Sequence, residues 1–108
     1  MDLNALPFDD QTMLRGLRPW VECESPTFDA SAVARMMDLA ARDFAMAGAR
    51  VETLAGRQGF GPCVRAHFAG SGPARPGILV LAHLDTVHPV GTIETLRWRQ
   101  EDGRCYGP

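Results

Sequence analysis

The chain has 108 residues, a formal net charge of −2 and 45% hydrophobic residues, which is the make-up of a single globular domain with a sizeable core. Its eleven cationic side chains, all arginine, are outnumbered by thirteen acidic ones, which argues against a nucleic-acid partner. No apolar stretch reaches the ~18 residues of a membrane span, and residues 1–7 lack the regions of a secretion signal, so we expect neither membrane insertion nor export.

Two amphipathic helices are predicted in the first half of the chain. The first starts at Asp9-Asp10, acidic residues suited to a helix N-terminus, and Pro19 is expected to kink or shorten it. The second follows Asp29, a good N-cap, and ends at Gly48, where a C-terminal cap belongs. Its Met-rich apolar stripe, which begins at Val33, is expected to pack in the core rather than to hold a cofactor.

After the second helix the pattern changes to that of strands. Residues 50–54 and 63–68 are predicted to be strands, joined by a glycine-rich turn over 56–62. Because no helix is expected after these glycines, they do not indicate a phosphate site. A second turn is expected over residues 70–77.

The last third of the chain predicts the rest of a sheet. The continuous apolar run over 78–82 is typical of a strand covered on both faces. Residues 98–106 predict a hairpin that turns at Asp102-Gly103. Together these elements indicate a layered α/β domain.

His83 and Asp85 directly follow the apolar run. Two residues apart on a strand, their side chains would share one face, at the carboxyl end where open α/β sheets place their sites. A neutral imidazole is a good zinc ligand, and its second nitrogen commonly needs a carboxylate that fixes its orientation. The pair therefore suggests a metal site, against the plainer reading of a His and an Asp that merely end a strand.

A longer pattern surrounds this pair. It comprises His83-x-Asp85-Thr86-Val87, Pro89 and Gly91, then Trp98, then Asp102-Gly103-x-x-Tyr106-Gly107-Pro108. The pattern resembles the start of the di-zinc metallopeptidases that include glutamate carboxypeptidase, acetylornithine deacetylase, succinyl-diaminopimelate desuccinylase and the aminoacylases. The helices and strands before His83 also follow that family's order, so the resemblance covers the whole chain. It implies an α/β fold in which helices flank a mixed, mostly parallel sheet that is incomplete at its carboxyl side.

The resemblance implies that His83 is the first metal ligand and that Asp85 is the catalytic carboxylate that orients it without binding metal. It further implies two zinc ions, which cobalt or manganese could replace, and hydrolysis of amide bonds in N-acyl amino acids or small peptides. One His cannot hold two metals, so the other ligands and a general-base Glu would lie beyond Pro108. We therefore expect residues 1–108 to be the amino-terminal portion of a catalytic domain, inactive and unstable or self-associating alone, with homodimerisation through a domain absent here.

The alternative is a non-catalytic binding or interaction module that retains the His-x-Asp pair as a relic. His67 lies in an alternating strand and needs no function, whereas His88 begins a loop near the pair and could touch a substrate. The cysteines Cys23, Cys63 and Cys105 are odd in number and widely spaced. They indicate reduced, mostly packed thiols of a cytoplasmic protein.

Overall fold

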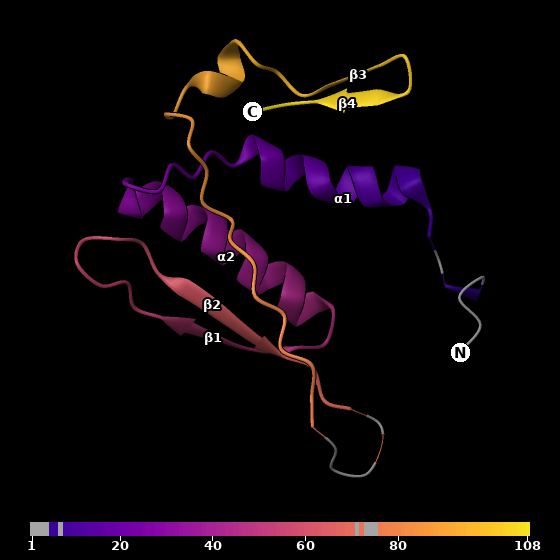
Figure 1. The fold of residues 1–108 in the computed structure, drawn as a ribbon, viewed down its shortest axis with the longest axis vertical. Helices are drawn as coiled ribbons and strands as arrows, with labels where there is room; N and C mark the ends of the chain where they lie inside the picture. Colours follow the sequence, from indigo (N-terminus) through magenta and orange to yellow (C-terminus); the bar gives the residue numbers. More distant parts are fainter. Residues whose placement is uncertain (1–4, 7, 71, 73–75) are drawn as a thin grey trace.

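The structure, a computed structural model, describes residues 5, 6, 8–70, 72 and 76–108. The expectations for the amino terminus at residues 1–4 and 7, and for the turn at residues 71 and 73–75, lie outside this part. The elements in chain order are α1 (Asp10–Glu22), α2 (Ala30–Met46), β1 (Arg50–Leu54), β2 (Cys63–His67), the 3₁₀ helix η2 (Thr92–Glu94), β3 (Arg99–Glu101) and β4 (Arg104–Tyr106) (Figure 1). The fold is mixed α/β, as predicted.

The first helix begins where its acidic residues predicted. The Asp9 carboxylate accepts a hydrogen bond from the backbone N–H of Thr12 at 2.6 Å, which satisfies one of the unpaired donors of the first turn. The expectation that Pro19 shortens the helix is wrong. Proline lacks an N–H, but its carbonyl still accepts a hydrogen bond, and here the N–H of Cys23 donates to it at 3.1 Å, so that the helix continues to Glu22.

The second helix carries the core. Asp29 caps it by accepting from the N–H of Ala32 at 2.9 Å. The fully buried apolar side chains among the described residues all come from this helix, and they are Ala32, Val33, Met36 and Ala40. The predicted stripe is therefore confirmed as core packing at Val33, Met36 and Ala40, whereas Ala47 at its far end is exposed. The core is smaller than the composition suggested.

Gly48 ends α2 in the predicted way. Its φ of 93° lies in the left-handed region that favours glycine. Its N–H donates to the carbonyl of Ala45, and the N–H of Ala49 donates to that of Phe44, each at 3.0 Å. This pair of bonds is the Schellman arrangement, which satisfies carbonyls that the end of a helix leaves unpaired.

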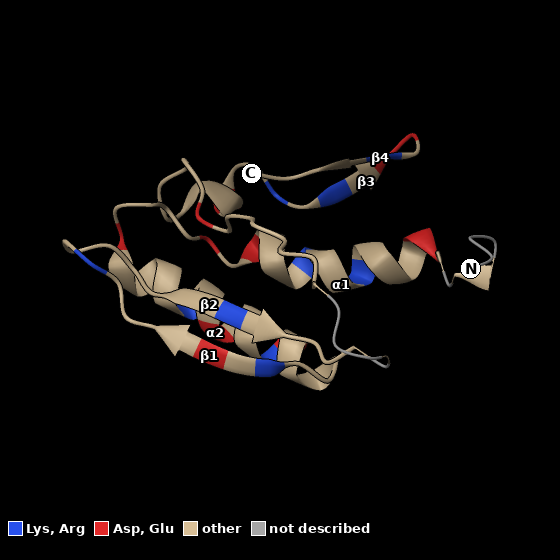
Figure 2. Ribbon diagram, turned by 60° about the horizontal axis from the view of Figure 1, so that its bottom comes forward, with Lys and Arg blue, Asp and Glu red and all other residues tan. Residues whose placement is uncertain are grey.

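The strands β1 and β2 form an antiparallel hairpin that packs on α2 (Figure 2). Their register runs from Arg50 opposite His67 to Leu54 opposite Cys63. The loop between them approaches the helix so closely that a Cβ at Gly61 would lie 2.5 Å from the Val33 side chain. A residue larger than glycine would therefore displace the loop or open the core.

The second hairpin is also confirmed. Asp102 and Gly103, with φ of 51° and 73°, form the tight turn between β3 and β4. The Arg99 guanidinium carbon lies 4.2 Å from the centre of the Tyr106 ring, a cation–π contact across the two strands. Figure 2 shows acidic and basic positions interspersed along the helices and hairpins.

The predicted strand over residues 78–82 is wrong. Figure 1 shows this segment as irregular chain without a strand, and the side chains from Ile78 to Leu81 are 81–94% exposed. A strand requires a neighbour whose N–H and C=O groups face its own, and β1 and β2 are paired with each other. Both sheets in the described part of the chain are antiparallel, and the parallel pairing there is the isolated bridge between Pro26 and Thr86.

The molecule is flat and open. It measures 49 × 43 × 19 Å, and its radius of gyration of 16.3 Å exceeds the ~13 Å expected for a compact chain of this length. Its accessible surface of 8791 Å² compares with roughly 5,900 Å² for a compact monomer of this size. Within the described ranges, no helix has both the length and the apolarity to cross a membrane.

Candidate functional site

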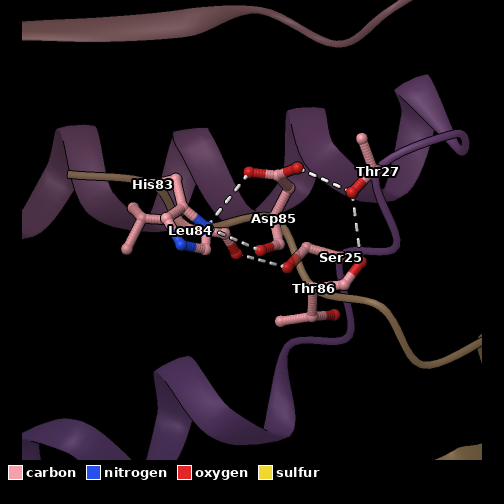
Figure 3. A network of polar contacts seen from close by, with 6 residues as sticks. All are labelled: Ser25, Thr27, His83, Leu84, Asp85 and Thr86. Carbon is pink, nitrogen blue, oxygen red and sulfur yellow. Dashed lines mark hydrogen bonds and ion pairs between the residues drawn. The ribbon is translucent and has the colours of Figure 1, made fainter.

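The site is held by two segments that are distant in the sequence. The segment that follows α1, residues 25–27, lies beside residues 84–86 (Figure 3). The N–H of Thr86 donates to the carbonyl of Ser25 at 2.8 Å, and the N–H of Thr27 donates to that of Thr86 at 3.1 Å. The Ser25 hydroxyl, only 1% exposed as a residue, donates to the carbonyl of Leu84 at 2.7 Å. His83 and Asp85 are therefore positioned by these bonds and not by the strand that the sequence predicted.

The structure brings the His83 and Asp85 side chains together. The His83 Nδ1 atom lies 3.1 Å from the backbone oxygen of Asp85 and 3.5 Å from its carboxylate Oδ1. Because both neighbours are acceptors, we assign the proton of the neutral ring to Nδ1. The side chain is 86% exposed, and among the described residues Nε2 has no hydrogen-bond partner, so its lone pair is available to a metal or a substrate.

The carboxylate of Asp85 is shared between two partners. Its Oδ2 accepts a hydrogen bond from the Thr27 hydroxyl at 2.6 Å, while Oδ1 faces His83. The Thr27 bond is the main reason why the pKa of Asp85 is held below its ordinary value, and it outweighs the opposing effect of partial burial. Asp85 is therefore ionised at neutral pH.

Glu24 is a polar anchor that the sequence analysis did not identify. Its two carboxylate oxygens accept from the N–H groups of Gly91 and Ile93, at 2.7 and 2.9 Å, and so hold the first turn of η2. These two bonds lower the pKa of Glu24. Gly91, the N-cap residue of η2, has a φ of 98°, in the left-handed region that favours glycine. No local pattern indicates this contact, because the partners are 67 and 69 positions apart.

A cavity of about 240 Å³ lies beside the pair, between the helices and the chain that follows His83. Its apolar wall is formed by Leu17, Trp20, Val21, Met36, Leu84 and Pro108, and its polar wall by Cys23, Glu24, His83, Asp85, Thr86 and His88. His88 is half-buried and lines this cavity, so it lies near the pair as predicted. His67 lies at the exposed end of β2 and is not part of this wall.

The cysteines depart from the expectation of packed thiols. All three are free, as predicted, but Cys63 and Cys105 are exposed. Cys63 and Cys105 lie on β2 and β4 of the two-stranded hairpins, where half of the positions face solvent. Cys23 is half-buried, and its burial raises the pKa of its thiol, so it stays protonated at neutral pH.

A metal centre needs several ligand side chains that lie close together. Nowhere in the described ranges do three His, Cys, Asp or Glu side chains gather so that they could hold a metal ion. Zinc needs three or four protein ligands, so His83 can serve only as one member of a larger set. Comparisons with protein-family models, with curated proteins and with solved structures found no match for this chain.

Proposed function

We propose that this chain is the amino-terminal part of a metal-dependent hydrolase of the di-zinc metallopeptidase type, which cleaves amide bonds of N-acyl amino acids or small peptides. The observation that carries the proposal is the presentation of His83. Its ring is exposed, its Nδ1 faces two oxygens of Asp85, and its Nε2 points to no partner within the described residues. This is the arrangement in which a protein offers an imidazole to a metal.

In this proposal, the described residues do a defined part of the work. His83 binds one metal ion through Nε2, and Asp85 fixes the ring and adds negative charge behind it. Bound zinc would supply Lewis-acid polarisation of the scissile carbonyl and an activated water. The remaining ligands and the general base would come from outside residues 1–108, because no three potential ligands gather among the residues described here.

The same proposal gives the exposed segment 78–82 a place in a larger sheet. Its apolar side chains and unpaired backbone suit a central strand that pairs with further parallel strands of the whole protein. A second domain of the whole protein would form a homodimer, as the resemblance implies. The three free thiols support a cytoplasmic location.

The metal-ligand role of His83 can be tested on residues 1–108. Zinc chloride is titrated into the ¹⁵N-histidine-labelled chain, and the ring nitrogens are followed by NMR. We expect weak binding, at about millimolar zinc because only one ligand is present, with the first and largest shift at His83 Nε2. His83→Ala should remove this shift, and His67→Ala is the matched control. Equal shifts at His67, His83 and His88 would favour the non-catalytic binding module.

The hydrolase role requires the product of the reading frame continued past Pro108. The resemblance predicts an Asp shortly after Gly107-Pro108 and a Glu-Glu pair further on. We expect that product to release the amino acid from N-acyl amino acids, to lose this activity with a chelator, and to lose at least about 10³-fold in kcat/KM with His83→Ala. His67→Ala should retain it. An active His83→Ala variant, or a reading frame without these residues, would overturn the proposal.

A further inference from the structure

Three residues of the segment that follows α1 reach the segment that carries the candidate site. Glu24 holds η2, Ser25 holds the carbonyl of Leu84, and Thr27 holds the side chain of Asp85. The contacts of Glu24 and Ser25 are with backbone atoms alone, so they fix the course of the chain. Thr27 differs, because its hydroxyl donates to a functional carboxylate.

The position of the Thr27 hydroxyl is itself fixed. The backbone N–H of Thr27 donates to the carbonyl of Thr86, and the N–H of Thr86 donates to the carbonyl of Ser25. The hydroxyl therefore stands on a short stretch of paired backbone, directly next to Asp85. It has one proton to donate, and the carboxylate at 2.6 Å is a stronger acceptor than the Thr86 carbonyl at 3.2 Å.

The Asp85 carboxylate needs such a restraint. Its side chain is 33% exposed, and its contact with His83 is a long one, 3.5 Å between Oδ1 and Nδ1. An exposed pair at this distance contributes little energy of its own and would not hold one rotamer. The shorter Thr27 bond, made to the other oxygen, turns Oδ1 toward the ring (Figure 3).

We propose that Thr27 is a positioning residue of this site, whose hydroxyl holds the Asp85 carboxylate in the orientation that faces His83. The inference rests on the proposed function for its catalytic meaning, while the hydrogen bond itself can be tested without metal. In this proposal Thr27 orients Asp85, and Asp85 in turn orients His83.

The test compares Thr27→Val, which keeps the shape and removes the hydroxyl, with Thr27→Ser, which restores it. Thr53→Val, at an exposed position of β1, is the matched control. The metal-free variants are studied by NMR at one pH at which His83 is neutral. The Asp85 χ1 rotamer is taken from side-chain couplings, and the His83 tautomer from its ring ¹⁵N shifts.

We expect one dominant Asp85 rotamer in the wild type and in Thr27→Ser, and an averaged one in Thr27→Val. The ratio of Nδ1-protonated to Nε2-protonated His83 should fall about two- to threefold in Thr27→Val, because a weak exposed contact is lost while the Asp85 carbonyl remains. Thr53→Val should match the wild type.

An unchanged rotamer and tautomer ratio in folded Thr27→Val would overturn the inference. If that variant loses its fold, Thr27→Ala removes the hydroxyl without placing a methyl group against the carboxylate, and the same two readings decide. Failure of the zinc titration with an intact Thr27 effect would reject the metal role alone. Loss of the Thr27 effect with zinc still bound at His83 would reject the positioning role alone.

Discussion

Trp20 illustrates how single polar contacts connect the helices of this protein. Its indole N–H donates to the Asp43 carboxylate at 2.7 Å, which joins α1 to α2. The same ring meets Phe44 edge to face, with 6.0 Å between the ring centres. Trp20 is half-buried, which leaves its N–H within reach of this polar partner.

This contact predicts a dependence of stability on pH. The Trp20 bond and then the neighbouring Arg42 hold the pKa of Asp43 below its ordinary value of 3.8. A carboxylate whose pKa is lower in the folded state stabilises the fold above its unfolded-state pKa, and this contribution is lost as the pH falls through the folded-state pKa. The acid limb of the stability curve should therefore contain a contribution from Asp43.

We expect Asp43→Asn to lower the free energy of unfolding at pH 7 by roughly 1 kcal/mol, since the acceptor loses its charge. The variant and the wild type should converge as the pH falls from 7 through the folded-state pKa of Asp43, which lies below 3.8. Urea unfolding followed by circular dichroism between these pH values measures the difference. Asp38→Asn, at an exposed position of the same helix, should follow the wild type throughout. A constant gap at all pH values would contradict the assignment to the charge of Asp43.

At the scale of elements, Gly16 and Gly48 form a matched pair. A Cβ added at either position would meet no heavy atom within 4 Å, so packing does not separate them. They differ in backbone conformation, because Gly16 lies inside α1 and Gly48 has a φ of 93° after α2. Alanine adopts the helical conformation of Gly16 without strain, whereas the left-handed conformation of Gly48 is strained for alanine.

We expect Gly16→Ala to stabilise the chain by about 0.5–1 kcal/mol through helix propensity. Gly48→Ala should destabilise it by about 1 kcal/mol or more, because the left-handed conformation now carries a Cβ. Thermal or urea unfolding of the two variants beside the wild type measures both effects. Destabilisation by both substitutions, or by neither, would show that backbone conformation does not decide these positions.

At the scale of the whole molecule, the open arrangement leaves much apolar surface in water. The longest continuous stretch of large exposed apolar side chains among the described residues is 78–81. The sequence from 76 to 84 contains no Asp, Glu, Lys or Arg. The backbone groups of residues 78–81 are also unpaired. Exposed apolar residues on an unpaired, extended segment favour pairing with another chain.

We therefore expect the 108-residue chain to self-associate through this segment as its concentration rises. Replacing Leu79 and Leu81 together by Glu should shift the weight-average mass, measured by analytical ultracentrifugation, toward that of the monomer. The matched control replaces Met13 and Leu17 of α1, which are also exposed, by Glu. It should leave the association unchanged. A wild-type chain that stays monomeric and melts cooperatively would contradict this expectation.

Local elements were predictable because their determinants are close in the sequence. Asp9 and Asp29 each accept a hydrogen bond from the backbone N–H three residues ahead, in the first turn of the helix. Asp102 and Gly103 themselves adopt the positive φ angles of the hairpin turn. These features appear in the structure as predicted. The conformation of residues 78–82 was not predictable in this way. Their apolar composition favours a strand, but a strand forms only beside a neighbouring segment that pairs with its backbone.

The candidate site divides in the same way. The sequence alone identified His83 and Asp85, since two residues of spacing suffice to bring an imidazole and a carboxylate together. The tertiary structure alone decided that Thr27, 58 positions away, holds Asp85 and that Glu24 holds η2. A hydrogen bond between distant residues depends on where the whole chain places their backbones, and no short pattern of residue types contains that information.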